Sequence, residues 1–398
     1  QTSEGTYVRR APGLTLAALL LAAPVTAVPL EILNDPNHPL SQSTPAPAPE
    51  VRVTPSAAAE AALQYRSGDT VNLFCNVGQF KWGTFGGTDC WGWTGPDGTE
   101  YALMGVYDGI AIVDATHMVD VDRVPGPQDF CGSARWRDIK SYQHYAYAVS
   151  ECSGTNAGLM VIDLQFLPDS VHFVGAYTVS NAGHRTSHNI SIDTVKGYLY
   201  AEGTSSVGQA IHILSLANPA NPVYIGSFGI ANGIHDIFAH DDTVYVAEGT
   251  NPSFSLWDLS NKLAPALIRR VNVPSPGYVH NIWPTDDREY VVTTEETANR
   301  TVKVWDIRDL DDIALVGHYL APSNLAHNAH MEGDTIYISH YESGVRVVDI
   351  TVAETPVEIA SYDTYASETP NFNGCWGVYP HTSSGLVYAS NMDGTLII

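Results

Sequence analysis

The sequence predicts an all-β fold, a seven-bladed β-propeller whose ring is closed by a strand from its N-terminal side. Three observations support this prediction. A unit with four strand-length runs recurs seven times, most copies contain an alternating apolar run that ends in Asp, and the last copy stops before its fourth strand. A period in the forties with about four short strands per unit is typical of propeller blades, whereas helical repeats of that length show a 3.6-residue period.

The clearest copy of the unit is Gly277–Leu310. Its first run starts at His280, an Asp-rich turn leads to a β-rich run over Tyr290–Thr294, and an acidic turn leads to an alternating run over Val302–Asp306. Each run has the length and period-two pattern of a strand, with turn residues at its ends. The copy therefore predicts an antiparallel meander.

The first position of the unit defines an anchor residue in every copy. The anchors are Trp91, Trp136, His188, His235, His280, His327 and Trp376, with gaps of 45, 52, 47, 45, 47 and 49 residues. Such even spacing predicts seven successive blades.

The third run of each copy supports the repeat independently. These runs are Ile110–Asp114, Leu159–Asp163, Ile211–Ser215, Phe254–Asp258, Val302–Asp306, Val345–Asp349 and Thr395–Ile398. After the seventh there is no room for a fourth strand, and the run Cys75–Trp82 lies at the matching distance before Trp91. We expect this run to complete the last blade, because ring closure removes the exposed edges of a linear array.

The composition divides the chain into three parts. Residues 1–27 combine two arginines, an apolar stretch and a small-residue cleavage site, which is typical of a secretory signal peptide. Residues 28–68 are rich in Pro, Ala and Ser, which predicts a flexible linker. The propeller is expected over 69–398, and no other run is apolar enough to cross a membrane.

The balance of acidic and basic residues limits the classes of partner that the protein can bind. Forty-three acidic and nineteen basic residues give a formal net charge of −24. Such a surface repels nucleic acid and anionic lipid and suits a soluble, exported, monomeric protein, so we expect an extracellular protein or a polysaccharide as partner.

Five cysteines in an exported chain allow disulfides. Cys131 and Cys152 flank the first two strands of their blade at the same end, which makes them the preferred pair. Cys90 and Cys375 each precede a Trp-Gly pair in neighbouring copies, and Cys75 on the closing strand could pair with either. The odd count leaves one thiol over.

The anchors and the acidic turns after the second strands are expected at one rim of the channel, because the start of strand one and the end of strand two share an end of a meander. The aromatic and acidic candidates at this rim are Trp91, Trp136, Trp376, Glu151, Glu202, Glu248, Glu295 and Glu342.

Four successive blades place His at the anchor position, and two interpretations follow. In the first, a transition metal is bound by His188, His235, His280 and His327, and the rim carboxylates supply further ligands. The same carboxylates could also bind calcium, which prefers oxygen ligands. Alternatively, the position requires a large flat side chain with an N–H donor, since Trp also occupies it, and the N–H makes a hydrogen bond between blades. No nucleophile elbow, His-Glu-x-x-His motif or phosphate loop is present.

The amino-acid sequence of several copies resembles that of the choice-of-anchor B family, whose members contain LVIVD repeats. The resemblance rests on Asp89–Trp93, Trp136–Lys140, Tyr278–Trp283 and Phe372–Pro380, and it covers about residues 72–398. It implies a β-propeller that is exported and held at the cell surface by a C-terminal anchoring segment. We identify no such segment in this sequence, and the resemblance implies no particular reaction.

Two classes of function remain open. The first is a secreted or surface-associated module that binds or adheres to protein or glycan through the propeller's loops. The second is a metal-dependent enzyme, a hydrolase, lyase or oxidase, that uses the histidines at the channel mouth with Glu202, Glu248 or Glu295 as general base.

Overall fold

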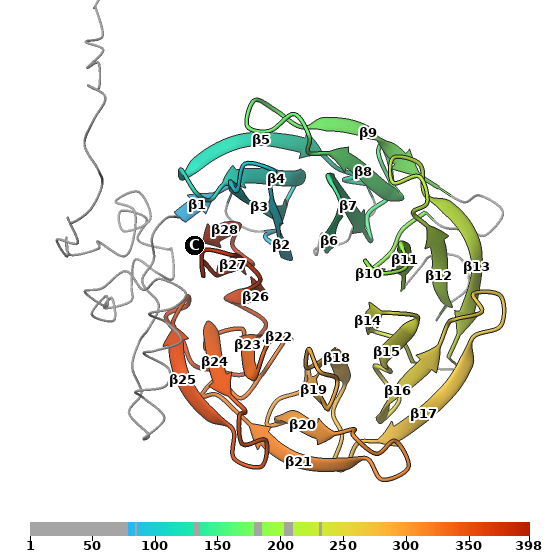
Figure 1. The fold of residues 1–398 in the computed structure, drawn as a ribbon. Coiled ribbons are helices and arrows are strands. Elements are labelled where there is room, and N and C mark those ends of the chain that lie inside the picture. The colour runs from blue at the N-terminus through green and yellow to red at the C-terminus, as the bar shows by residue number, and fades with distance from the viewer. Residues whose placement is uncertain (1–78, 84–85, 130–135, 179–184, 203–209, 231–232) are drawn as a thin grey trace, which may run out of the picture.

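The computed structural model describes residues 79–83, 86–129, 136–178, 185–202, 210–230 and 233–398 (Figure 1). The expected signal peptide 1–27, the linker 28–68, Cys75 and Cys131 lie outside the described residues. No helix in the described ranges is long and apolar enough to span a membrane.

Seven four-stranded antiparallel sheets are arranged in a ring, which confirms the predicted seven-bladed propeller (Figure 1). The first four blades are β2 (Cys90–Thr94), β3 (Glu100–Val106), β4 (Gly109–Asp114), β5 (Val119–Pro125); β6 (Arg137–Tyr142), β7 (Tyr145–Ser150), β8 (Leu159–Asp163), β9 (His172–Tyr177); β10 (Ile190–Asp193), β11 (Tyr198–Ala201), β12 (Ala210–Ser215), β13 (Val223–Gly229); and β14 (Asp236–His240), β15 (Thr243–Ala247), β16 (Ser253–Asp258), β17 (Ala266–Asn272). The last three are β18 (Val279–Pro284), β19 (Tyr290–Glu295), β20 (Val302–Asp306), β21 (Ala314–Tyr319); β22 (Asn328–Glu332), β23 (Thr335–Ser339), β24 (Val345–Asp349), β25 (Val357–Tyr362); and β26 (Cys375–Tyr379), β27 (Tyr388–Asn391), β28 (Thr395–Ile397), β1 (Gln79–Lys81).

The N-terminal strand closes the ring as expected. β1 pairs antiparallel with β28, with Gln79 opposite Ile397 and Lys81 opposite Thr395, and Figure 1 shows the blue β1 beside the dark red β28. Trp82, directly after β1, is buried in the layer between the last and first blades. Closure therefore joins the two ends of the described chain in one sheet.

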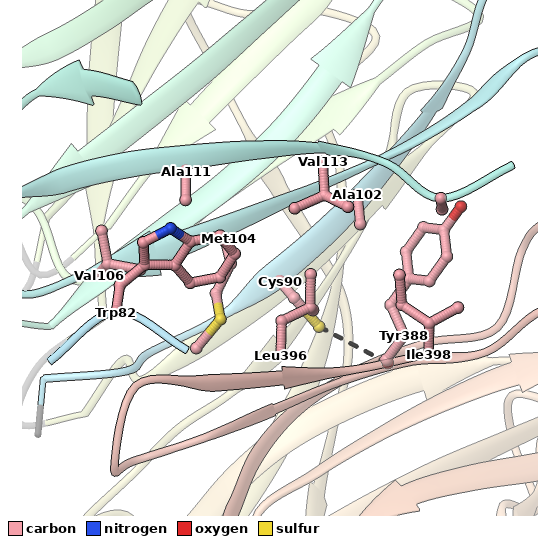
Figure 2. Close-up of a cluster of buried hydrophobic side chains, with 11 residues drawn as sticks. Trp82, Cys90, Ala102, Met104, Val106, Ala111, Val113, Tyr388, Leu396 and Ile398 are labelled. Carbon is pink, nitrogen blue, oxygen red and sulfur yellow. Dashed lines mark hydrogen bonds between the residues drawn. The ribbon is translucent and has the colours of Figure 1, made fainter. Parts of the chain in front are cut away.

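The core consists of apolar layers between neighbouring blades, because side chains alternate between the two faces of each sheet. On one face of the first blade, Leu103 and Ile112 pack against Ile139 of the second blade. On the other face, Met104 packs with Trp82 and Leu396 of the last blade, as Figure 2 shows. Each blade is thus packed between two neighbours.

The third strands lie where the alternating apolar runs predicted them, and they are almost wholly buried. In six blades the register between the third and fourth strands shifts by one residue. Such a bulge increases local twist. The outer strands, for example β17, carry the exposed side chains.

The suggested bridge between Cys90 and Cys375 is absent. Both are free, buried thiols, and no two cysteines of the described ranges are bonded to each other. The cause is packing. Cys90 lies in the layer between the last and first blades and donates to the carbonyl of Tyr388, whereas Cys375 lies in the layer on the other face of the last blade. The proposed partner of Cys152 lies outside the described residues, so that pair stays a prediction.

Candidate functional site

Six of the seven anchor residues meet in one arc of ring side chains. We call this group the aromatic collar. Its centroid distances are 4.1 Å for Trp136–Trp376, 4.0 Å for Trp376–His327, 4.4 Å for His327–His280, 4.0 Å for His280–His235 and 4.7 Å for His235–His188. The collar residues lie at or just before the innermost strand of blades two to seven. The repeat thus brings equivalent positions together, as the sequence predicted.

A bulge explains how neighbouring residues of one inner strand both line the channel. In blade five the register shifts between Val279 and Asn281, and in blade seven between Cys375 and Gly377. The extra residues at these two positions are His280 and Trp376, which join the collar. The next residue, Asn281 in blade five, lines a pocket further along the channel.

Hydrogen bonds between blades hold the collar histidines. Nδ1 of His235 donates to the carbonyl of His280 at 2.9 Å, and Nδ1 of His327 donates to the carbonyl of Trp376 at 2.5 Å. Because a carbonyl can only accept, Nδ1 carries the proton in both rings and Nε2 keeps its lone pair. Nδ1 of His188 instead lies 2.7 Å from Glu151 of the preceding blade. The predicted structural role is therefore present for these three histidines, and it leaves Nε2 available.

Burial keeps most of the collar uncharged. It lowers the pKa of His235 and His280 well below the usual value and lowers that of His327 to about 3. His188 differs. Although burial lowers its pKa, the hydrogen bond to Glu151 and the charge of that carboxylate raise the pKa above the ordinary value. The collar thus combines neutral imidazoles with one imidazole that favours protonation.

The acidic turn residues separate into two groups. Glu151 and Glu202 belong to the channel. Glu202 is fully buried, neither of its carboxylate oxygens has a hydrogen-bond partner among the described residues, and burial raises its pKa well above the usual range.

Glu248, Glu295 and Glu342 are engaged elsewhere. Their partners are Arg270 and Ser253 for Glu248, Lys303 and the Gly277 N–H for Glu295, and Thr369 and Asn373 for Glu342. Glu248 and Glu295 therefore hold turns and strands within their own blades, whereas Glu342 holds the segment between β25 and β26 that leads to the next blade. The hypothesis that Glu248 or Glu295 acts as a base has no support in their contacts.

Sequence analysis missed the carboxylate that reaches the collar in blade five. Glu296, the residue after Glu295, has its Oε2 3.8 Å from Nε2 of His280 and accepts a hydrogen bond from the hydroxyl of Tyr341. Ligand atoms of His280, His327 and Glu296 lie within 4.8 Å of one another. The sequence feature that could have identified Glu296 is the pair of consecutive Glu residues in this turn. Consecutive residues of an extended chain point to opposite sides, so one of the two can face the channel when the other faces the blade.

Trp91 does not join the collar. Its ring contacts Tyr379 at 4.9 Å and His330 at 5.9 Å, and its indole N–H donates to Ser141. In the first blade, Thr88 makes the backbone hydrogen bond to the second strand that His235 and His327 make in their blades. The prediction aligned Trp91 with Trp376 because a Gly follows both residues. The structure places Thr88, three residues earlier, at the position equivalent to the collar residues.

Trp91 instead lines a pocket of about 310 Å³ in the channel, which we call the channel pocket. Its walls include the ring side chains of Trp91, Phe238, Trp283, His330, Tyr379 and His381. Its polar lining includes Asp89, Asp138, Asn189, Asp236, Asn281 and Asn328, which follow the collar position along the inner strands or, for Asp89, follow Thr88. The pocket and the collar therefore lie at successive levels of the same strands.

The channel pocket contains one cation among several carboxyl groups. Lys140 Nζ lies 2.5 Å from Asp138 and 3.5 Å from Asp89, and 4.4 Å from the centroid of the Trp91 ring. Burial raises the pKa of Asp89 well above its usual range and that of Asp236 to about 6, although a hydrogen bond from Asn281 opposes the latter shift.

Several polar atoms of the channel pocket are unbonded. Nδ1 of His330, Nε2 of His381 and Oδ1 of Asn328 have no hydrogen-bond partner within the described ranges. Burial lowers the pKa of His330 well below the usual value and that of His381 to about 4, so both rings are neutral at pH 7. Because buried polar atoms are nearly always hydrogen-bonded, these atoms are candidates for hydrogen bonds to a ligand.

The fold and the two sites define the protein as a seven-bladed β-propeller with an aromatic collar and a polar channel pocket. No family model matches the sequence, and no curated protein matches it. Among solved structures, 1312 chains are similar, and a fold this widespread does not select a function.

One similar structure is that of Raptor from Chaetomium thermophilum, with a TM-score of 0.60 and 12% sequence identity. The match covers 85% of the present chain but only 30% of Raptor. At this identity the likeness establishes the propeller fold alone.

Proposed function

We propose that this protein is a secreted or surface-associated binding module that takes one saccharide unit of a glycan into its channel pocket. The observation that carries the proposal is the combination of aromatic walls with a buried polar lining in one pocket. Apolar sugar C–H faces pack on aromatic rings, and sugar hydroxyls both donate and accept hydrogen bonds. Ligand pockets are generally built from such apolar walls and a few placed polar groups.

The polar lining matches a polyhydroxyl ligand in donor and acceptor type. Asp138 and Asp236 offer carboxylate oxygens, Asn328 offers an unbonded amide oxygen, and His330 and His381 offer neutral rings. Carboxylates accept, amides do both, and a neutral imidazole has one donor and one acceptor. A hydroxyl-rich ligand would satisfy the atoms that protein groups leave unbonded.

Size and charge limit the ligand further. A volume of about 310 Å³ is at the lower end for small-molecule sites and suits a single saccharide unit. The formal charge of −24 and the three pocket aspartates disfavour polyanionic glycans and nucleic acid. We therefore propose a neutral or amino-sugar unit. The signal-peptide pattern and the resemblance to choice-of-anchor B proteins support placement outside the cell.

A glycan array followed by calorimetric titration of the best hit tests this proposal. Trp283→Ala removes a pocket wall whose ring lies 4.2 Å from that of His330, and we expect at least a tenfold loss of affinity, about 1.4 kcal/mol. Trp257→Ala is the matched control, because Trp257 packs on Phe228 between blades and does not line the pocket.

Circular dichroism spectra of both variants must match the parent spectrum. Absence of any bound glycan, or equal affinity of the Trp283→Ala variant and the parent, would overturn the proposal.

A further inference from the structure

Two imidazoles and one carboxylate converge at the collar level of the channel. One ligand atom from each of His280, His327 and Glu296 lies within 4.8 Å of the others. Two histidines and one carboxylate form a donor set that zinc and non-haem iron use in proteins. We propose that these three residues bind a divalent first-row transition-metal ion. This inference is independent of glycan binding in the channel pocket.

Hydrogen bonds already orient two of the three ligands. Nδ1 of His327 donates to the carbonyl of Trp376, which fixes the tautomer that presents the Nε2 lone pair. The hydroxyl of Tyr341 donates to Glu296, and the Tyr341 ring also packs against His327, with centroids 5.0 Å apart. Partners of this kind accompany most metal ligands in proteins and set their orientation.

The local charge favours a cation. Burial, followed by the charges of Glu202, Glu296 and Glu151, raises the pKa of Tyr278 to about 12, so all three carboxyl groups act on this part of the channel. In the described part of the chain, no lysine or arginine forms an ion pair with any of them. Glu151 is 43% exposed and pairs with His188, so Glu202 and Glu296 are the carboxyl groups that lack a cationic partner within the described ranges. A bound metal ion is a common remedy for carboxylates of this kind.

The spacing requires a small closure. Tetrahedral ligands at about 2.0–2.1 Å from zinc lie roughly 3.3 Å apart. Here Nε2 of His280 and Oε2 of Glu296 are 3.8 Å apart, and the ligand atoms of all three residues lie within 4.8 Å of one another. Glu296 follows the end of β19, and its side chain is 17% exposed, so rotation of this residue can bring the ligands together. Because three protein ligands do not fill a coordination sphere, the ion would keep an open position for water or substrate.

The test uses protein that is purified without a metal-affinity tag and dialysed against chelator. Zn²⁺ is titrated calorimetrically, and Co²⁺ is titrated by its visible absorption, which reports ligand number and type. We expect one ion per chain. Glu296→Gln and His327→Ala should each weaken Zn²⁺ binding at least tenfold and change the Co²⁺ spectrum.

His212→Ala is the control, because His212 is a buried histidine of β12 that packs against Tyr224 and belongs to neither the collar nor the channel pocket, so it should leave both titrations unchanged. Thermal melting confirms that each variant is folded, and the near-isosteric Glu296→Gln keeps the test valid if His327→Ala does not fold. Lack of stoichiometric binding by the parent, or parent-like binding by both ligand variants, would overturn the proposal. Glycan binding is assayed separately, so either proposal can fail alone.

Discussion

At the scale of single residues, one side chain serves two neighbours in the collar. A collar imidazole uses Nδ1 to hold the next blade through a backbone carbonyl and keeps Nε2 for the channel. The two interpretations of the histidines, structural hydrogen bonding and metal binding, are therefore compatible, since they use different nitrogens of the same ring.

Gly377 is a residue at which packing leaves no room for a side chain. A Cβ there would lie 2.3 Å from Oδ1 of Asp89 and 2.7 Å from Oγ of Ser390. We expect Gly377→Ala to reduce the free energy of unfolding by about 1–3 kcal/mol, as overpacking of a core does. Gly226→Ala, where the nearest atom is 3.8 Å away, should be close to neutral. Chemical denaturation of both variants measures the difference, and equal midpoints would contradict the account.

His381 should make stability depend on pH. The unfolded chain protonates this histidine near pH 6.5, whereas burial lowers the folded pKa to about 4. Its contribution is complete above pH 6.5 and is lost as the pH falls toward 4, because the unfolded state then binds the extra proton.

We expect His381→Gln, which cannot be protonated, to lose about 2 kcal/mol less stability than the parent between pH 7 and 5. The comparison must be a difference between the two proteins, because Asp236, with its pKa raised to about 6, changes the parent's stability in the opposite direction over the same range. Parallel stability curves for the two proteins would show that His381 is not responsible.

At the scale of elements, sequence patterns predicted the strands well and the site only in part. Third strands such as Ile110–Asp114 could be located because alternation and a closing Asp are local features. Trp91 was misplaced because a Trp-Gly pair matches in sequence while the inner strand of the first blade is offset. Glu296 reaches the collar whereas Glu295 pairs within its own blade, and the channel pocket is formed by several blades. Both features depend on bulges and on neighbouring blades, which the sequence of one repeat does not encode.

Arg137 joins two blades through buried hydrogen bonds. Its guanidinium donates to the carbonyls of Val106 at 3.0 Å and Pro127 at 2.7 Å, and the residue is 2% exposed. We expect Arg137→Met to destabilise the fold by about 2–3 kcal/mol, because charged donors make strong bonds and the carbonyls lose their partners. Arg123→Met, which removes a half-exposed ion pair with Asp108, should cost less than about 1 kcal/mol. Urea denaturation should rank the two variants in that order.

At the scale of the whole molecule, the ring depends on β1. Trp82 is 8% exposed, donates to Asp120 and packs with Met104 (Figure 2). We expect Trp82→Ala to cost about 3–5 kcal/mol and deletion of residues 79–82 to unfold all blades in one transition. Phe166→Ala, an aromatic truncation at a half-exposed loop position, is the control. Retention of a folded domain without residues 79–82, detected by calorimetry, would show that closure is dispensable.

The pairing of β1 with β28 also determines how the ring responds to mechanical load. Gln79 lies opposite Ile397, so the first residue of β1 and the last residue of β28 share one end of a short antiparallel pair. A pulling force between these two residues would break the backbone hydrogen bonds of the pair one after another. A force along the strand axes would instead load all of these hydrogen bonds at the same time. The closure therefore resists tension between these two residues less well than it resists shear along the two strands.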